Sequence, residues 1–268
     1  MKKFLLLSLL IGIALSANAQ CTTTNNAIQA GEELTYKLKF NWKFIWINAG
    51  HANMSVKNTT YQGKPALITR LRSYTNKTID HYFKMRDTLS CITSEELQPL
   101  YFKKCAEEGK RYTVDEVWFS YKNNKCNVRQ ERRRQNKPTL YFYQDRDDCV
   151  FDMLSILLQA RSYDASNYKV GDKIHFPMAT GKVIEEQTLI YRGNKNFVAE
   201  NGVKYRCLKF SLVEYDKKGK EQEVITFFVT DDKNHLPVRL DLYLSFGSAK
   251  AFLSSIKGNK HPLTSIVP

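Results

Sequence analysis

Residues 99–134 read PLYFKKCAEEGKRYTVDEVWFSYKNNKCNVRQERRR, and this stretch decides the fold class. Aromatic and β-branched residues, which favour strands, are frequent across it. Two short turn-forming pairs, Gly109-Lys110 and Asn123-Asn124, divide it into three runs. The pattern predicts a meander of three antiparallel strands over 99–106, 112–121 and 125–134.

The same pattern extends through most of the chain, which contains neither a low-complexity linker nor an internal repeat. Further strands are expected over residues 33–40, 54–60, 66–74, 87–93, 173–178, 183–192, 204–215, 223–230 and 237–246. Only residues 147–163 have apolar residues at helical spacing, and Asp147 or Asp148 is expected to cap this helix. We therefore expect a mainly β protein: a single large curved antiparallel sheet, as a half-barrel or open barrel, with one main helix packed on it. Two sub-lobes joined by the helix are the alternative.

Residues 1–19 have the pattern of a secretory signal peptide. Lys2 and Lys3 precede an apolar run that is too short to span a membrane, and Ala17-Asn18-Ala19 supplies small residues for cleavage. We expect a signal peptide over 1–19 and a single exported β-rich domain over 20–268, located in the periplasm or secreted. Cys21 offers an alternative, a lipid anchor, but Gln20 is larger than the residue that normally precedes an acylated cysteine.

The charge of the chain indicates which partners it attracts. It has 41 Lys and Arg against 27 Asp and Glu, a formal net charge of +14. A basic protein attracts anions through long-range fields, and outside the cytoplasm the abundant anions are lipid head groups, glycolipids and acidic polysaccharides. We expect a lipid, a glycolipid or an acidic glycan as partner, peripheral membrane contact, no nucleic acid, and a monomer. The plain alternative is a solvated basic surface without a specific ligand.

The six cysteines are Cys21, Cys91, Cys105, Cys126, Cys149 and Cys207, and none forms a C-x-x-C pair. This spacing argues against zinc and thioredoxin-type chemistry, whereas an even count in an exported protein is compatible with disulfides. Spacing does not assign the pairs. Because Cys91, Cys105, Cys126 and Cys149 fall in consecutive expected strands and at the start of the helix, we predict at least one disulfide among these four.

No motif identifies a catalytic centre, so no catalytic residue, metal or cofactor is expected. The five histidines lack an H-E-x-x-H pattern, and Ser155 lacks the glycines of a nucleophile elbow. The acidic cluster at Asp145, Asp147 and Asp148 suits the start of a helix, whose first amide groups are unpaired.

An aromatic series is the first candidate for a binding site. Phe40, Trp42, Phe44 and Trp46 alternate strictly, which in a strand places all four on one face. Such a face could line a cavity for acyl chains or form a platform for sugar rings. We predict that it contacts a hydrophobic ligand beneath the helix, at Phe151, Leu154 and Leu158. Core packing is the competing interpretation, because Phe and Trp bury large areas.

A basic run is the second candidate. Within residues 129–137, strand alternation places Arg132 and Arg134 on one face. Guanidinium groups bind phosphate and carboxylate through paired hydrogen bonds, so these two arginines could hold the anionic head of a guest. The competing interpretation is an edge strand kept soluble by its charges.

Three segments resemble a bacterial exported family known only as domain of unknown function 3108. They are Glu107-Glu108-Gly109-Lys110, the helical run from Phe151 to Arg161, and the ending that runs from Thr230-Asp231-Asp232 through Leu236-Pro237-Val238-Arg239 to Phe246-Gly247-Ser248-Ala249. The family has no established activity, so the resemblance transfers no functional residue. The expected layout is also similar to periplasmic curved-sheet carriers of the lipoprotein-carrier family, on architecture alone.

These observations favour a non-enzymatic envelope protein that binds an amphiphilic or anionic ligand such as a lipid, a lipoprotein acyl chain or a glycolipid. The first alternative is a structural or partner protein of envelope assembly without a ligand cavity. The second is a glycan-active hydrolase whose carboxylate pair meets only in three dimensions.

Overall fold

The computed structural model describes residues 21–42, 45–216, 218–244 and 247–268, so the expected signal peptide over 1–19 lies outside the described residues. Fourteen strands form one antiparallel sheet in the order β8-β7-β6-β5-β4-β3-β2-β1-β14-β13-β12-β11-β10-β9. The strands are β1 (Glu33–Trp42), β2 (Ile45–Tyr61), β3 (Lys64–Thr75), β4 (Met85–Thr93), β5 (Pro99–Glu108), β6 (Arg111–Lys122), β7 (Lys125–Arg134), β8 (Leu140–Arg146), β9 (Lys173–Ala179), β10 (Ile184–Val198), β11 (Lys204–Tyr215), β12 (Glu221–Thr230), β13 (Pro237–Leu244) and β14 (Gly247–Lys257). The expected single antiparallel sheet is confirmed.

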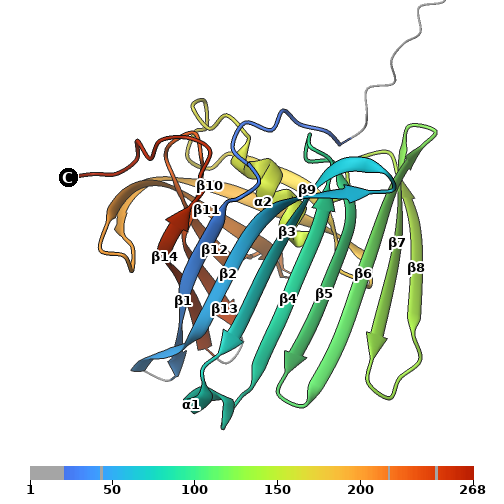
Figure 1. Ribbon diagram of the computed structural model, residues 1–268, viewed down its shortest axis with the longest axis horizontal. Coiled ribbons are helices and arrows are strands. Elements are labelled where there is room, and N and C mark those ends of the chain that lie inside the picture. Colours follow the sequence, from blue (N-terminus) through green and yellow to red (C-terminus); the bar gives the residue numbers. More distant parts are fainter. Residues whose placement is uncertain (1–20, 43–44, 217, 245–246) are drawn as a thin grey trace, which may run out of the picture.

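The sheet curves around one main helix, as expected. Figure 1 shows β1 to β8 in front and the later strands behind, with α2 (Met153–Arg161) between them. The short helix α1 (Lys77–Asp80) connects β3 to β4. The sheet is not closed into a barrel, because the edge strands β8 and β9 do not pair with each other.

Contacts outside the sheet ladder bring its two halves together. The amide of Phe151 donates to the carbonyl of Pro177, and the amide of Ala179 donates to the carbonyl of Phe151. The amide of Gly181 donates to Oε1 of Gln130 over 2.8 Å. Only glycine fits at position 181, because the φ angle there is +81° and an added Cβ would lie 2.5 Å from the Cβ of Asp115.

The helix is shorter than the sequence pattern predicts. It begins at Met153 rather than near residue 147, and its cap is Asp152, so the predicted cap at Asp147 or Asp148 is wrong. Asp152 Oδ1 accepts from the amides of Leu154 and Ser155, and Ser155 Oγ accepts from the amide of Asp152. The helix cannot begin earlier because the backbone at Phe151 bridges to Met178 of β9. Asp148 forms an ion pair with Arg146.

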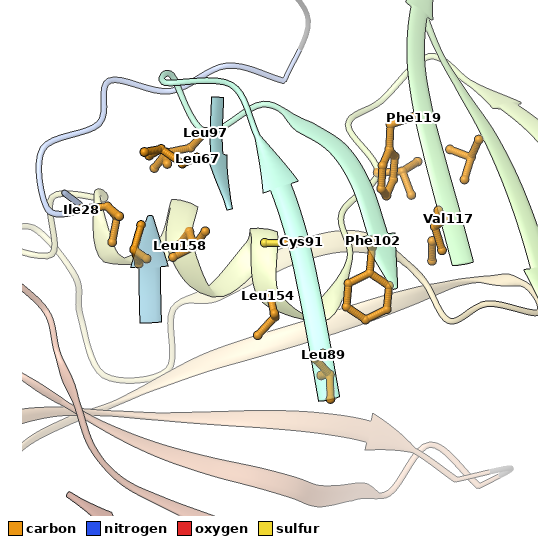
Figure 2. Close-up of a cluster of buried hydrophobic side chains, with 14 of the residues drawn as sticks. Ile28, Leu67, Leu89, Cys91, Leu97, Phe102, Val117, Phe119, Leu154 and Leu158 are labelled. Carbon is orange, nitrogen blue, oxygen red and sulfur yellow. The ribbon is translucent and has the colours of Figure 1, made fainter. Parts of the chain in front are cut away.

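The main core lies between α2 and the sheet strands β2 to β7. Figure 2 shows Leu154 and Leu158 of α2 directed toward Cys91 and its neighbours. The buried members of this cluster are Ala27, Ile28, Val56, Leu67, Leu89, Cys91, Leu97, Phe102, Val117, Phe119, Cys126, Val128, Val150, Leu154, Leu158 and Ala179. Two further clusters continue along β1 and β10 to β14.

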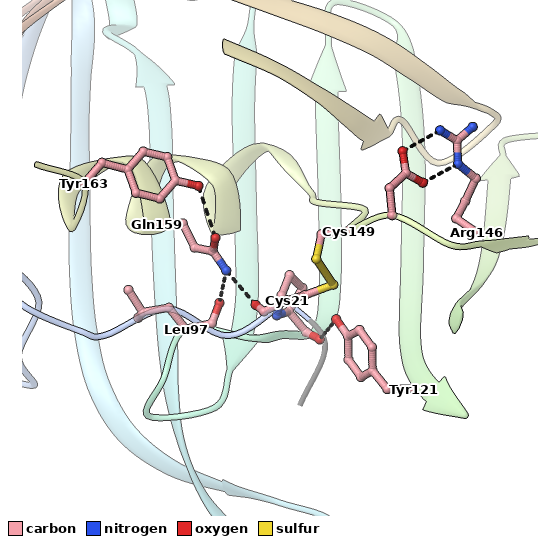
Figure 3. The surroundings of a disulfide bond; sticks show 9 residues. Cys21, Leu97, Tyr121, Arg146, Cys149, Gln159 and Tyr163 are labelled. Carbon is pink, nitrogen blue, oxygen red and sulfur yellow. Dashed lines mark hydrogen bonds and ion pairs between the residues drawn. A yellow bond between two sulfur atoms is a disulfide. The ribbon is translucent and has the colours of Figure 1, made fainter. Parts of the chain in front are cut away.

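One disulfide fixes the start of the described chain to this core. It joins Cys21 to Cys149, whose Cα atoms are 5.2 Å apart (Figure 3). The predicted pairing among Cys91, Cys105, Cys126 and Cys149 is therefore wrong, since Cys149 bonds outside that set and the other three are free. The side chain of Gln159 completes the attachment by donating to the carbonyls of Cys21 and Leu97, over 2.8 and 3.1 Å.

A buried ion pair holds the other end of α2. Arg161 donates from both terminal nitrogens to the carboxylate of Glu32, over 2.7 and 2.8 Å. The side chains are 1% and 0% exposed. Arg161 Nε also donates to the carbonyl of Asn234, so the helix is connected both to the segment before β1 and to the β12–β13 turn.

The sequence pattern missed two strands and one helix: β8, β14 and α1. No helix in the described part of the chain is long and apolar enough to cross a membrane.

Candidate ligand-binding face

The four predicted aromatics do not share one strand. β1 ends at Trp42 and β2 begins at Ile45, so a hairpin connects them. Asn41 pairs with Trp46 and Phe40 with Ile47, and paired residues lie on the same face of a sheet. Trp46 therefore lies on the face opposite Phe40, and the expected common face is wrong for Trp46. Phe44 lies outside the described residues, as does the side chain of Trp42.

The three predicted residues near the helix are part of the core. Leu154 and Leu158 are buried in the cluster around Cys91, and Leu158 is 0% exposed. Phe151 precedes the helix, and its ring contacts that of Phe176 edge-on, with centroids 6.4 Å apart. Protein side chains, rather than open space, surround these residues.

The two predicted arginines have different environments. Arg132 donates from Nε and Nη2 to the two carboxylate oxygens of Asp115, over 2.6 and 2.8 Å, and from Nη2 to the carbonyl of Thr180. Arg134 is exposed at the end of β7. The structure thus gives Arg132 a role in joining β6 and β7 to the β9–β10 turn, which the sequence did not indicate.

A continuous row of apolar side chains crosses the helix-facing side of eight strands. Leu38, Leu240 and Ala251 pack against the cluster that also contacts Leu157 of α2. A second row lies two residues further along the same strands and on the same face. In this row each residue pairs with a residue on the neighbouring strand. This apolar row consists of Ile47, Phe40, Ala249, Leu242, Ile225, Leu212, Leu189 and Ile174. Every member is partly exposed, so water reaches this wall.

The facing half of the sheet presents charged groups on its helix side. Residues Leu89, Lys104, Asp115 and Arg132 are paired across β4 to β7, and Leu89 belongs to the core around α2. Lys104, Asp115 and Arg132 also line a pocket of about 120 Å³, together with Phe102, Met153, Met178, Ala179 and Thr180. The interior therefore has an apolar wall on β1, β2 and β9 to β14 and a charged wall on β5 to β7.

Two interior carboxyls have raised pKa values. Burial raises the pKa of Asp87 to about 6, and the charge of nearby Lys104 opposes the shift. Burial also raises the pKa of Asp152 to about 6, and its backbone hydrogen bonds oppose the shift. Oδ2 of Asp152 and Oδ1 of Asp87 are buried without a hydrogen-bond partner among the described residues.

Sequence reasoning missed the apolar row, although part of its signal was present. Leu189, Leu212, Ile225 and Leu242 each lie in an expected strand. Their alignment depends on the register of seven strand pairs, and a one-residue slip in any pair would move a side chain to the other face.

A family model and one solved structure are similar to the chain over most of its length. The family model described as "Protein of unknown function (DUF3108)" matches residues 35–254. A β-barrel-like protein of the domain of unknown function DUF1849 from Brucella abortus is similar in structure, with a TM-score of 0.55 and 7% identity over 88% of this chain and 98% of that chain. A second structure, described as a "putative exported protein with YmcC-like fold" from Bacteroides fragilis, has a TM-score of 0.34 and 9% identity over 89% of this chain and 100% of that chain. No curated protein is significantly similar to the chain.

Proposed function

The chain belongs to the DUF3108 family, and from this premise we propose that it is a non-enzymatic, exported envelope protein that binds an amphiphile on the helix-facing side of its sheet. The observation that carries the proposal is the apolar row from Ile47 to Ile174. Exposed apolar surface costs about 25 cal/mol per Å² in water. An acyl chain lying along the row would remove this cost.

The charged wall supports an amphiphile over a purely apolar guest. Lys104 lines the 120 Å³ pocket and forms no ion pair with any residue that the structure describes. Arg132 already forms an ion pair with Asp115. We therefore propose that Lys104, rather than Arg132, attracts the anionic head of the ligand. Of the residues predicted from sequence, Phe40 remains in the proposed acyl site, and Leu154 and Leu158 support the site from the core.

Export is part of the proposal and rests on the sequence of residues 1–19. The disulfide between Cys21 and Cys149 supports it, because such bonds persist in oxidising compartments. The Cys21 sulfur in this bond is not available for a thioether-linked lipid.

Binding of a fluorescent single-chain fatty acid tests the proposal. Ile225→Asp places a charge in the apolar row, and Ile68→Asp is a matched control because Ile68 is a partly exposed residue of β3 on the other face. We expect wild type and Ile68→Asp to bind with similar affinity and Ile225→Asp to bind about tenfold more weakly or worse. Thermal unfolding of each variant checks that it is folded.

Two results would contradict amphiphile binding. One is a wild-type protein that binds neither the fatty acid nor a lysophospholipid and carries no lipid when purified from its native host. The other is equal weakening by both variants, which would exclude the apolar row as the binding site. The first result favours the alternative of an envelope-assembly partner without a ligand.

A further inference from the structure

The connections at one end of the sheet carry an unusual surface. In an antiparallel meander, alternate connections lie at the same end. The end of β1, the start of β2, the β5–β6 and β7–β8 connections and α1 accordingly lie along the lower edge of the view in Figure 1. The end of β13 and the start of β14 lie at the same edge, because Asn41 near the end of β1 pairs with Ser248 near the start of β14, and Leu244 pairs with Gly247.

Large apolar side chains are exposed along this edge. Tyr82 is 76% exposed, Ile45 68% and Phe83 48%. We call the whole set the aromatic rim: Ile45, Trp46, Tyr74, Tyr82, Phe83, Tyr112, Tyr243 and Leu244. Single exposed apolar residues are common on proteins, but a group gathered at one end marks an interaction site.

Cations accompany the aromatic rim. Lys77, Lys110, Arg111, Arg134 and Lys137 are exposed in α1, the β5–β6 turn, the start of β6, the end of β7 and the β7–β8 turn. None of the five forms an ion pair with a residue in the described part of the chain. Of the acids at this edge, Glu107 and Asp80 are paired with Lys84 and Arg86, and the exposed Glu108 leaves the cations in excess. The edge is therefore both apolar and positively charged.

The opposite end of β2 to β7 lacks this character. Its exposed turn residues are polar: Gln62, Glu95, Glu96, Asn123 and Asn124. Within β2 to β7, the large exposed apolar side chains are thus gathered at the rim end.

We propose that the aromatic rim docks the protein onto the surface of a bilayer that contains anionic lipids. Tyrosine and tryptophan side chains are amphipathic and lie at the level of the lipid head groups. Nearby lysines and arginines attract anionic head groups. Charge complementarity selects this occupant over a second copy of the chain, which would bring five uncompensated cations against five others. Ile47 and Phe40 of the apolar row lie next to the rim residues Ile45 and Trp46, so docking would bring a bilayer close to the proposed acyl site.

Co-sedimentation with vesicles tests this surface without any guest. The wild-type protein should sediment with vesicles of phosphatidylglycerol and phosphatidylcholine and much less with phosphatidylcholine alone. Raising the salt to about 0.5 M should weaken the binding, because it screens exposed charges.

Two double variants separate the rim from the rest of the surface. Tyr82→Ser/Phe83→Ser should reduce the bound fraction by about tenfold or more. Tyr143→Ser/Val198→Ser removes two equally exposed apolar side chains outside the rim, 70% and 56% exposed, and should leave binding unchanged. Both variants should retain the wild-type melting temperature and fatty-acid affinity in solution.

The proposal is overturned if wild type ignores anionic vesicles, or if both double variants lose binding equally. It is also overturned if the rim variant abolishes a wild-type dimer while vesicle binding is unaffected, since the rim would then be an interface between copies. Loss of fatty-acid binding with intact vesicle binding would count against the proposed function alone.

Discussion

The end of the sheet that holds α2 and the end that carries the aromatic rim use apolar residues in opposite ways. Near α2, Leu154, Leu158 and their neighbours are buried, and the Cys21–Cys149 disulfide and the Arg161–Glu32 ion pair fix the helix in place. At the rim, Tyr82 and Phe83 are exposed beside lysines and arginines. The contacts at the α2 end stabilise the fold, and the rim end is where we propose that the protein binds. Substitutions at the two ends should therefore differ in stability and in binding.

The largest loss of stability is expected from the double substitution Cys21→Ser/Cys149→Ser. The bond spans 128 residues of sequence. In the chain-entropy model, a loop of this size restricts the unfolded chain by about 5 kcal/mol. Urea unfolding should show most of this loss, and reduction of the wild-type protein should reproduce it. A change below about 1 kcal/mol would mean that the bond does not stabilise the α2 end.

Arg161→Met should lower the free energy of unfolding by roughly 3–5 kcal/mol, because it leaves the carboxylate of Glu32 buried without a partner. The exposed pair Arg206–Asp231 is the control, and Arg206→Met should cost less than about 1 kcal/mol. Urea unfolding of both variants measures the difference. Similar losses in the two variants would contradict a special contribution from the buried pair.

Asp152→Asn should flatten the pH dependence of stability. The folded pKa of Asp152, about 6, is raised above the ordinary value of 3.8, so the native state retains this proton where the unfolded state releases it. The contribution of Asp152 is fully present below about pH 4 and is lost as the pH rises through 6, a change of about 3 kcal/mol. The difference between wild-type and Asp152→Asn unfolding curves at pH 4 and pH 7 isolates this residue from Asp87. If the difference in unfolding free energy between wild type and Asp152→Asn is the same at pH 4 and pH 7, the pKa of Asp152 is not raised.

Truncation of the apolar row should affect binding more than stability. Ile225 is partly exposed, so Ile225→Ala should cost about 1 kcal/mol, whereas Leu158→Ala in the core should cost roughly 2–5 kcal/mol. Fatty-acid affinity should fall in Ile225→Ala and remain at the wild-type level in the folded fraction of Leu158→Ala. The reverse pattern would assign the row to the core.

The smallest change in stability is expected at the rim itself. Tyr82→Ser removes a side chain that is 76% exposed, and such surface changes usually stay within about 0.5 kcal/mol. Thermal unfolding should therefore be unchanged while vesicle binding falls. A loss of several degrees in melting temperature would show that Tyr82 packs against the protein.

The sequence by itself determined the strand-rich class and the one main helix, because alternation and helical spacing are local patterns. The central meander from Pro99 to Arg134 is confirmed to within two residues at each end of its strands. The signal peptide and the single domain over 20–268 remain predictions from sequence.

Only the tertiary structure decided which residues meet. The partner of Cys149 is Cys21, 128 residues away, and strand spacing contains no information on such a contact. The alternation of Phe40 and Trp46 continues through a hairpin, which reverses the chain and places the two on opposite faces. The apolar row requires the register of seven strand pairs at once, and register is fixed by packing across the whole sheet and not by any one strand.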